Sequence, residues 1–229
     1  MAKASTRTPV PGPAFIRLLA RFSDADLPRT PPVLTERLAD WFDWNRALVL
    51  SRALDGSLPA AEDGADAEEA HDAECVRVRH VLMEAIDADI APPPPDRKDA
   101  PAIDDDYQPY RQHCMAAQRA MQSATGRLRG RLRDALARQS PAKARLAEVD
   151  AVMEAVLSPR EQMLLAGVPG LLGLHYRRLR EAGAPCSTDT SAAGPWLARF
   201  RQDMRMALLA ELEVRFHPID GLLAALRTR

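Results

Sequence analysis

The chain has 229 residues, of which 46% are hydrophobic and 28% charged, and its formal net charge is −1. This balance permits a packed core, and a net charge near zero excludes steering to DNA or anionic lipid by an overall field. Ala, Leu, Arg and Glu are common while β-branched residues are sparse, which favours helix over strand. We expect an all-α fold, a multi-helix bundle of about seven to nine helices with a Pro-rich internal linker.

The N-terminal sequence lacks a secretory apolar core, and no stretch approaches the ~18 apolar residues of a membrane span. We therefore expect a cytoplasmic protein without membrane insertion. The three cysteines, Cys75, Cys114 and Cys186, lie far apart and form no CxxC pair. This spacing argues against a disulfide framework, so we expect them to act as small apolar residues.

The first half of the chain is predicted to contain a mobile tail over residues 1–13 and an N-terminal helical part over 14–90. Phe15, Leu18, Leu19 and Phe22 have the spacing of one short amphipathic helix. Residues 57–74 contain seven acidic residues and no basic one, which is typical of a solvated entrance to the helix that follows.

The segment 34–56 is predicted to form an amphipathic helix whose apolar face includes Trp41, Leu48 and Val49. Asn45 and Arg52 fall on that same face, where a polar group needs a partner. We favour hydrogen bonds or ion pairs between helices for these two residues, with a ligand contact as the alternative.

Residues 91–106 contain four consecutive prolines and are predicted to be an extended, acidic linker. The linker separates the N-terminal part from a C-terminal helical part over 107–229. The sequence leaves open whether the two parts are separate domains or one domain whose surface the linker crosses.

The C-terminal part begins with a long predicted helix from Tyr107 to about Gln139, in which Gly126 and Gly130 suggest a kink or a close neighbour. Ser140-Pro141 is typical of a helix start, so the next helix forms either an antiparallel hairpin with the first or one bent rod. A capping box at residues 158–161 and the glycines of 167–170 predict two further breaks. The stretch 140–183 would then be three short core helices packed against Trp41 and Trp196.

The last predicted helix opens at Pro195, and Pro218 is predicted to end it before a short terminal helix over 219–229. Glu211 falls on the apolar face of this helix. Arg215 follows one turn later, and this spacing allows an ion pair between the two side chains.

The region 111–145 is the one charge feature above background, with nine basic residues and a single acidic residue, Asp134. These arginines could neutralise nucleic-acid phosphates, pair with an acidic protein partner or with the acidic segment 62–74, or form a solvated helix flank. The candidate contacts flank the apolar stripe of the predicted helix and are Arg127, Arg129, Arg131, Arg133 and Arg138.

Motifs for catalysis or cofactor binding are lacking. The sequence has no GxSxG elbow, no Walker loop and no GxGxxG. His71 and Cys75 are four residues apart, but no second pair with metal-ligand spacing accompanies them. We expect no enzymatic activity, no metal and no cofactor, although carboxylates brought together from different helices would escape this reasoning.

Three stretches resemble an uncharacterised proteobacterial family of about this length, classed as a domain of unknown function. They are WFDWNRALVLSRALDG (41–56), SPREQMLLAGVPGLLGLHYRRL (158–179) and WLARFRQDMRMALLAELEVRFHPIDGLLAAL (196–226). The resemblance implies a protein that accompanies MotA/MotB-like inner-membrane motor proteins, in one grouping similar to Zorya anti-phage defence systems. It supplies no catalytic residues.

From the resemblance and the lack of catalytic motifs we expect a non-enzymatic cytosolic accessory or adaptor protein. It would belong to a motor-linked defence system and act through contacts with other proteins of that system. The alternative is a nucleic-acid-binding effector that uses the arginine-rich helix within 111–145.

Overall fold

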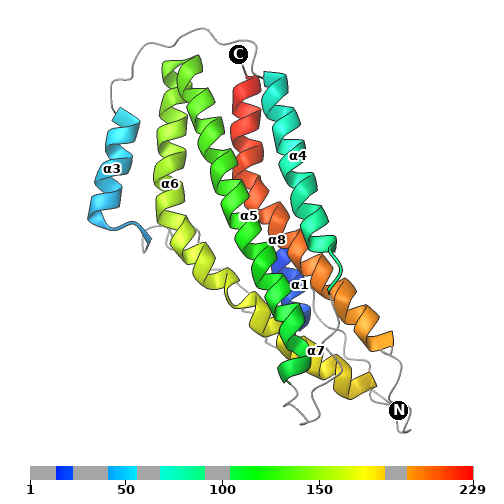
Figure 1. The fold of residues 1–229 in the computed structure, drawn as a ribbon. Coiled ribbons are helices and arrows are strands. Elements are labelled where there is room, and N and C mark those ends of the chain that lie inside the picture. Colours follow the sequence, from blue (N-terminus) through cyan, green and yellow to red (C-terminus); the bar gives the residue numbers. More distant parts are fainter. Residues whose placement is uncertain (1–13, 23–40, 56–67, 91–103, 184–194, 229) are drawn as a thin grey trace, which may run out of the picture.

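The computed structural model describes residues 14–22, 41–55, 68–90, 104–183 and 195–228, and the regular structure in these ranges is helical (Figure 1). The all-α prediction is therefore confirmed for this part of the chain. The predicted total of seven to nine helices stays a prediction for the whole chain. The predicted tail 1–13, most of the linker 91–106 and Cys186 lie outside the described residues. The helices are α1 (Ala14–Phe22), α3 (Trp44–Asp55), α4 (Glu68–Asp87), α5 (Asp104–Gln139), α6 (Pro141–Leu165), α7 (Val168–Gly183) and α8 (Pro195–Arg227).

Helix α5 is the centre of the bundle and packs against α4, α6, α7 and α8 (Figure 1). Its 36 residues correspond to a length of about 54 Å. The apolar stripe predicted from 3.6-residue periodicity is confirmed, because all of its members are buried. They are Cys114, Ala117, Met121, Leu128, Leu132 and Ala135.

Residues from both sides of the predicted linker share one hydrophobic core. Phe22 of α1 and Leu82 of α4 belong to the same buried cluster as Met121 of α5 and Phe216 of α8. Each such large side chain contributes about 1.5–3 kcal/mol when it leaves water. The described parts of 14–90 and 107–229 therefore stabilise each other. The linker prediction is wrong at its end, because residues 104–106 already belong to α5.

Helices α5 and α6 form an antiparallel hairpin, one of the two arrangements that the sequence allowed. Ser140 caps α6, with its side chain accepting a hydrogen bond from the backbone N–H of Lys143 at 3.2 Å, and Pro141 occupies the first helical position. The ammonium of Lys143 also donates to backbone carbonyls of Leu226 and Thr228. The hairpin turn therefore holds the end of α8.

Two predicted helix ends are wrong, at Pro159 and at Pro218, because both prolines lie inside continuous helices. An interior proline costs roughly 3 kcal/mol. Beyond Pro218, however, Ile219, Leu222 and Leu226 are buried, and at ~1.5–3 kcal/mol each their burial exceeds that cost. Figure 1 shows α6 changing direction in its lower half, as expected of a helix with an interior proline. The stretch 140–183 therefore forms two helices, with the break predicted at Gly167–Gly170 lying at residues 166–167.

The predicted kink or close neighbour at Gly126 and Gly130 is also wrong. Both glycines lie within continuous α5, and a methyl group added at either one would meet nothing within 4 Å. A glycine that does make a close approach between helices is Gly173 of α7. A Cβ there would lie 2.9 Å from Cε1 of Tyr107, so α5 and α7 approach at a point where only glycine leaves room.

Candidate functional site

Two of the predicted arginine contacts are occupied within the protein. Arg129 and Arg133 of α5 face α6, where Asp150 accepts hydrogen bonds from both, at 2.6 and 2.8 Å from Arg129 and 3.1 Å from Arg133. Glu154 accepts a further bond from Arg133 at 2.5 Å. The four side chains are only 13–25% exposed, so this is a partly buried ion-pair cluster that joins α5 to α6.

The other three predicted arginines lie on different sides of α5. Arg131 forms an ion pair with Glu74 of α4 at 2.5 Å, which is the pairing with the acidic segment 62–74 that the sequence suggested. Arg127 donates to the hydroxyl of Ser123 one turn earlier, and Arg138 is exposed. The five predicted contacts therefore do not form one surface, and three of them already neutralise carboxylates of the described chain.

Glu211 is fully buried and is the centre of a polar network between α5, α6 and α8. Its carboxylate accepts hydrogen bonds from Arg215 at 2.9 and 3.0 Å, which confirms the predicted i,i+4 pair, and from the Gln118 amide at 2.9 Å. The same amide nitrogen donates to the Leu165 carbonyl at 2.9 Å, and Arg215 also contacts Glu161 at 3.2 Å. Burial raises the pKa of Glu211, although the bonds from Gln118 and Arg215 oppose that effect.

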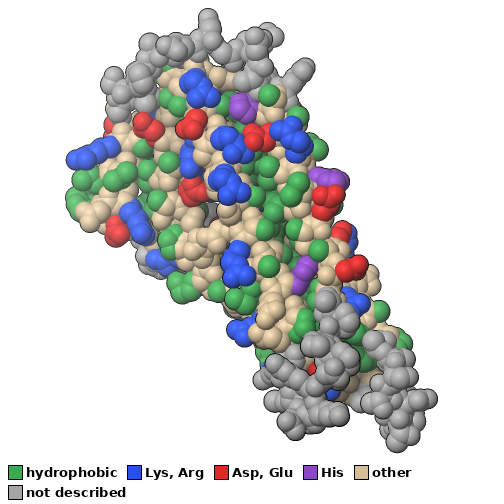
Figure 2. All heavy atoms as spheres, viewed as in Figure 1, with side chains coloured by type: hydrophobic (Ala, Val, Ile, Leu, Met, Phe, Trp, Pro, Cys, Tyr) green, Lys and Arg blue, Asp and Glu red, His purple; other side chains and the backbone are tan. Residues whose placement is uncertain are grey.

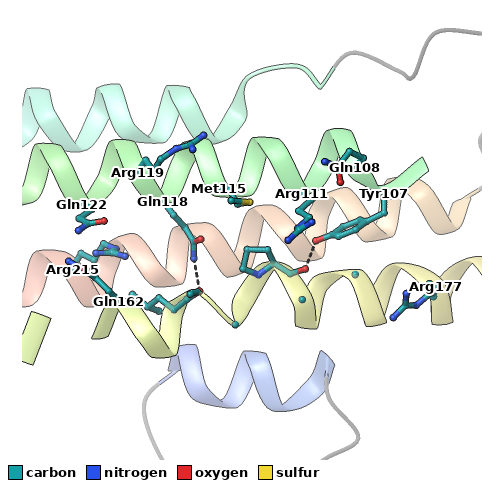
Figure 3. A pocket seen from close by; sticks show the side chains of 16 residues that line it. Tyr107, Gln108, Arg111, Met115, Gln118, Arg119, Gln122, Gln162, Arg177 and Arg215 are labelled. Atoms are coloured by element: carbon teal, nitrogen blue, oxygen red, sulfur yellow. Dashed lines mark hydrogen bonds between the residues drawn. The ribbon is translucent and has the colours of Figure 1, made fainter. Parts of the chain in front are cut away.

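Beside this network lies a cavity of about 570 Å³, which we call the α5–α7 cavity (Figure 3). It lies between α5 and the end of α6 and start of α7, with Arg215 of α8 in its lining. The lining is polar and rich in arginine, glutamine and glycine. It consists of Tyr107, Gln108, Arg111, Met115, Gln118, Arg119, Gln122, Gln162, Leu165, Ala166, Gly167, Pro169, Gly170, Gly173, Arg177 and Arg215.

The charged side chains of this lining are all positive. It contains four arginines, and none of the described residues that line it is acidic. A smaller cavity of about 210 Å³ shares Gln122, Gln162 and Arg215 with it and has a mixed lining that includes Glu154 and Glu161. On the face seen in Figure 2, carboxylates accompany the basic side chains in the upper half but not in the middle of the lower half.

One end of the α5–α7 cavity is held by Tyr107. Its hydroxyl donates to the Pro169 carbonyl at 2.6 Å, which fixes α5 to the first turn of α7 (Figure 3). Burial is the main cause of a raised pKa for this hydroxyl, so it stays protonated and able to donate at any physiological pH. Figure 3 places Arg111 next to this bond, while Arg119 extends away from the α6 side.

The polar residues predicted on the apolar face of the 34–56 helix are not buried there. Asn45 and Arg52 are both exposed, and Leu48 and Val49 of the predicted apolar face are exposed as well. The described part of this helix, α3, packs against α6, and only Ala53 is buried. The prediction of interhelical bonds for Asn45 and Arg52 is therefore wrong, because the helix presents little of that face to the bundle.

A second buried polar pair lies under α1. His175 Nε2 of α7 and Asp203 Oδ2 of α8 are 2.8 Å apart, and the ring of Phe22 lies 4.6 Å from the His175 ring. This pair packs α1 onto the bundle. Across the described ranges, no group of three or more histidine, cysteine, aspartate or glutamate residues is arranged to hold a metal ion.

Sequence reasoning missed the α5–α7 cavity and the contribution of Gln118 to the Glu211 network. A signal was present, because Tyr107–Arg133 contains no acidic residue and Arg111, Met115, Gln118 and Gln122 recur at helical spacing. That pattern marks one polar face of α5. It does not reveal that the break between α6 and α7 lies opposite this face.

Comparison with known families gives a match that covers residues 1–228. The chain belongs to DUF3348, a family of proteins of unknown function. This confirms the predicted membership of an uncharacterised family and says nothing of MotA/MotB-like proteins or Zorya systems. No curated protein and no solved structure matches the chain. In the described ranges, none of the helices combines the length and the apolarity that crossing a bilayer requires.

Proposed function

We propose that this DUF3348 member is a non-enzymatic helical accessory protein that acts by binding another protein through the α3–α6 side of the bundle. The observation that carries the proposal is Trp44, whose side chain is 80% exposed at the start of α3. Tryptophan is enriched among the residues that dominate protein interfaces, and it is costly to leave in water.

Further exposed apolar side chains lie on α6, the helix against which α3 packs. The Arg160 guanidinium of α6 lies 5.2 Å from the centre of the Trp41 ring, which brings the start of α3 to this part of α6. Met163 and Leu164, one turn after Arg160, are 71% and 74% exposed. An apolar group with basic residues at its edge suits a partner that offers an apolar helix face with acidic flanks.

The identity of the partner is proposed from the sequence resemblance alone. It points to a MotA/MotB-like membrane motor and to a cytoplasmic role in anti-phage defence. The test is to co-express the tagged chain with a MotA/MotB-like motor pair and to measure co-purification. Trp44→Ser should reduce recovery at least tenfold, whereas Val76→Ser, at an apolar position of α4 that is 68% exposed, should leave it unchanged.

Two outcomes would reject the proposal. One is equal recovery of the motor proteins with wild type and with Trp44→Ser. The other is a concentration-dependent dimer that Trp44→Ser abolishes, because the apolar group would then bind a second copy of the chain. Of the five arginines predicted to contact nucleic acid, Arg127 and Arg138 form no ion pair with the described residues. The absence of a DNA mobility shift at low salt would remove the nucleic-acid alternative.

A further inference from the structure

We infer that the α5–α7 cavity binds a small organic phosphate, a phosphate monoester whose neutral body offers hydrogen-bonding groups. The volume of about 570 Å³ lies within the ~300–1,000 Å³ typical of small-molecule sites. The cavity is thus large enough for a molecule rather than only an ion.

Arg111 is the residue that would receive the phosphate. Among the described residues it forms no ion pair, and Figure 3 shows its side chain extending from α5 toward the Pro169 end of the cavity. Arginine matches the oxygens of a phosphate with two parallel hydrogen bonds. The other groups at this end are Arg177 on α7 and the first turn of α7, whose positive dipole end also favours an anion.

The nearby carboxylates do not compete with the anion. Glu211 is bound by Gln118 and Arg215, and Glu161 is bound by Arg215, so the charge of Arg215 is already balanced. Arg111 and Arg119 add positive charge to the lining and form no ion pair with the described residues. This distinguishes the cavity from its smaller neighbour, whose lining includes the carboxylates Glu154 and Glu161.

The rest of the lining suits a neutral polar body. Gln108, Gln122 and Gln162 each carry an amide that both donates and accepts hydrogen bonds, and Met115 and Leu165 add apolar contact. Gly170 leaves the opposite side open, because a Cβ built there would meet nothing within 4 Å. A ligand can therefore approach the backbone of α7 closely.

The test is calorimetric titration of the full chain at low salt with adenosine monophosphate, inorganic phosphate and uncharged adenosine. Adenosine monophosphate should bind saturably and adenosine should not. Arg111→Gln should weaken binding about tenfold or more, because it removes a charge-assisted contact. Arg119→Gln should have a smaller effect, because its side chain extends away from the α6 side.

Two more variants separate a specific cavity from general attraction. Gly170→Leu should abolish binding by filling the open space while leaving every charge in place. Arg127→Gln, on the same helix but outside the lining, should change affinity less than twofold. Circular dichroism would confirm that each variant is folded.

Three results would overturn the inference. They are no saturable binding by either phosphate probe, equal binding of adenosine and adenosine monophosphate, or equal weakening by Arg111→Gln and Arg127→Gln. The last result, with a DNA oligonucleotide as competitor, would indicate nucleic-acid binding along the helix instead. Recovery of a protein partner through Trp44 is a separate measurement, so its outcome does not decide this one.

Discussion

Replacing Asp150 by Asn is the sharpest test of how α5 and α6 are held together. The change keeps the size of the side chain but removes one of two carboxylates that balance Arg129 and Arg133. Among the described residues, Glu154 would remain as the only counter-ion for two guanidinium groups that are 14% and 20% exposed. The variant therefore leaves one uncompensated positive charge in a partly buried site.

The expected cost lies between two measured limits. Exposed ion pairs contribute ~0–1 kcal/mol, whereas breaking a buried pair costs about 3–5 kcal/mol. Because Asp150 is 13% exposed and accepts from both arginines, we expect a loss of about 2 kcal/mol in the free energy of unfolding. For a chain of this size that corresponds to a fall of about 4–8 °C in Tm.

The assay is urea unfolding followed by circular dichroism. The urea concentration at the unfolding midpoint should fall, while the dependence of the unfolding free energy on urea concentration stays constant. Asp134→Asn provides the matched control, because Asp134 is exposed on α5 and forms no ion pair with the described residues. It should change stability by less than ~0.5 kcal/mol. Equal losses in the two variants would refute the reasoning, since net charge rather than the cluster would then explain the effect.

Three further predictions concern Glu211 and the glycines of the helices. Burial raises the pKa of Glu211 above its usual 4.5, so the folded state holds its proton to higher pH and unfolding free energy declines as pH rises above about 4.5. Glu211→Gln should remove this decline, so the unfolding free energy of the variant should rise relative to that of the wild type as pH increases. A difference between the two proteins that stays constant with pH would contradict this. Gly173→Ala should cost about 1–3 kcal/mol through overlap with Tyr107, whereas Gly170→Ala, measured in the same urea assay, should cost nothing. Gly130→Ala should raise Tm, because alanine is preferred in an open helical position by ~1 kcal/mol.

The helices themselves were largely predictable because their signals are local. The buried stripe of α5 follows from 3.6-residue periodicity, and the Ser140 cap follows from the side chain and the proline beside it. The Glu211–Arg215 pair could also be predicted, since its partners are one turn apart on the same helix.

The wrong helix ends show where local signals fail. Pro218 carries a strong local penalty, but the burial of Ile219, Leu222 and Leu226 depends on α4 and α5, which are distant in sequence. For α3 the sequence predicted a buried face where the structure shows an exposed one. Leu48 and Val49 have amphipathic spacing, yet they remain exposed. The main contact of α3 is with one helix, α6, which does not cover these two side chains.

The candidate site was unpredictable for a related reason. Gln118 and Glu211 are 93 residues apart, and their bond depends on the register between α5 and α8. The arginines of α5 looked like one basic surface because they are close in sequence. A helix turns 100° per residue, however, so Arg129 and Arg131 face different neighbours and meet Asp150 and Glu74 respectively.

The distribution of partners along α5 argues for two roles in one helix. In its C-terminal half Arg129, Arg131 and Arg133 are matched by carboxylates of α4 and α6, an arrangement that holds helices together. Toward its N-terminal end Arg111 faces a cavity whose described lining has no carboxylate. The polar network of Glu211 lies between these two regions. A structural arginine is expected to be paired within the chain, as Arg129 and Arg133 are. An arginine beside a cavity without such a partner is better explained by an anion that arrives from outside, and this is why Arg111 is the first residue to substitute.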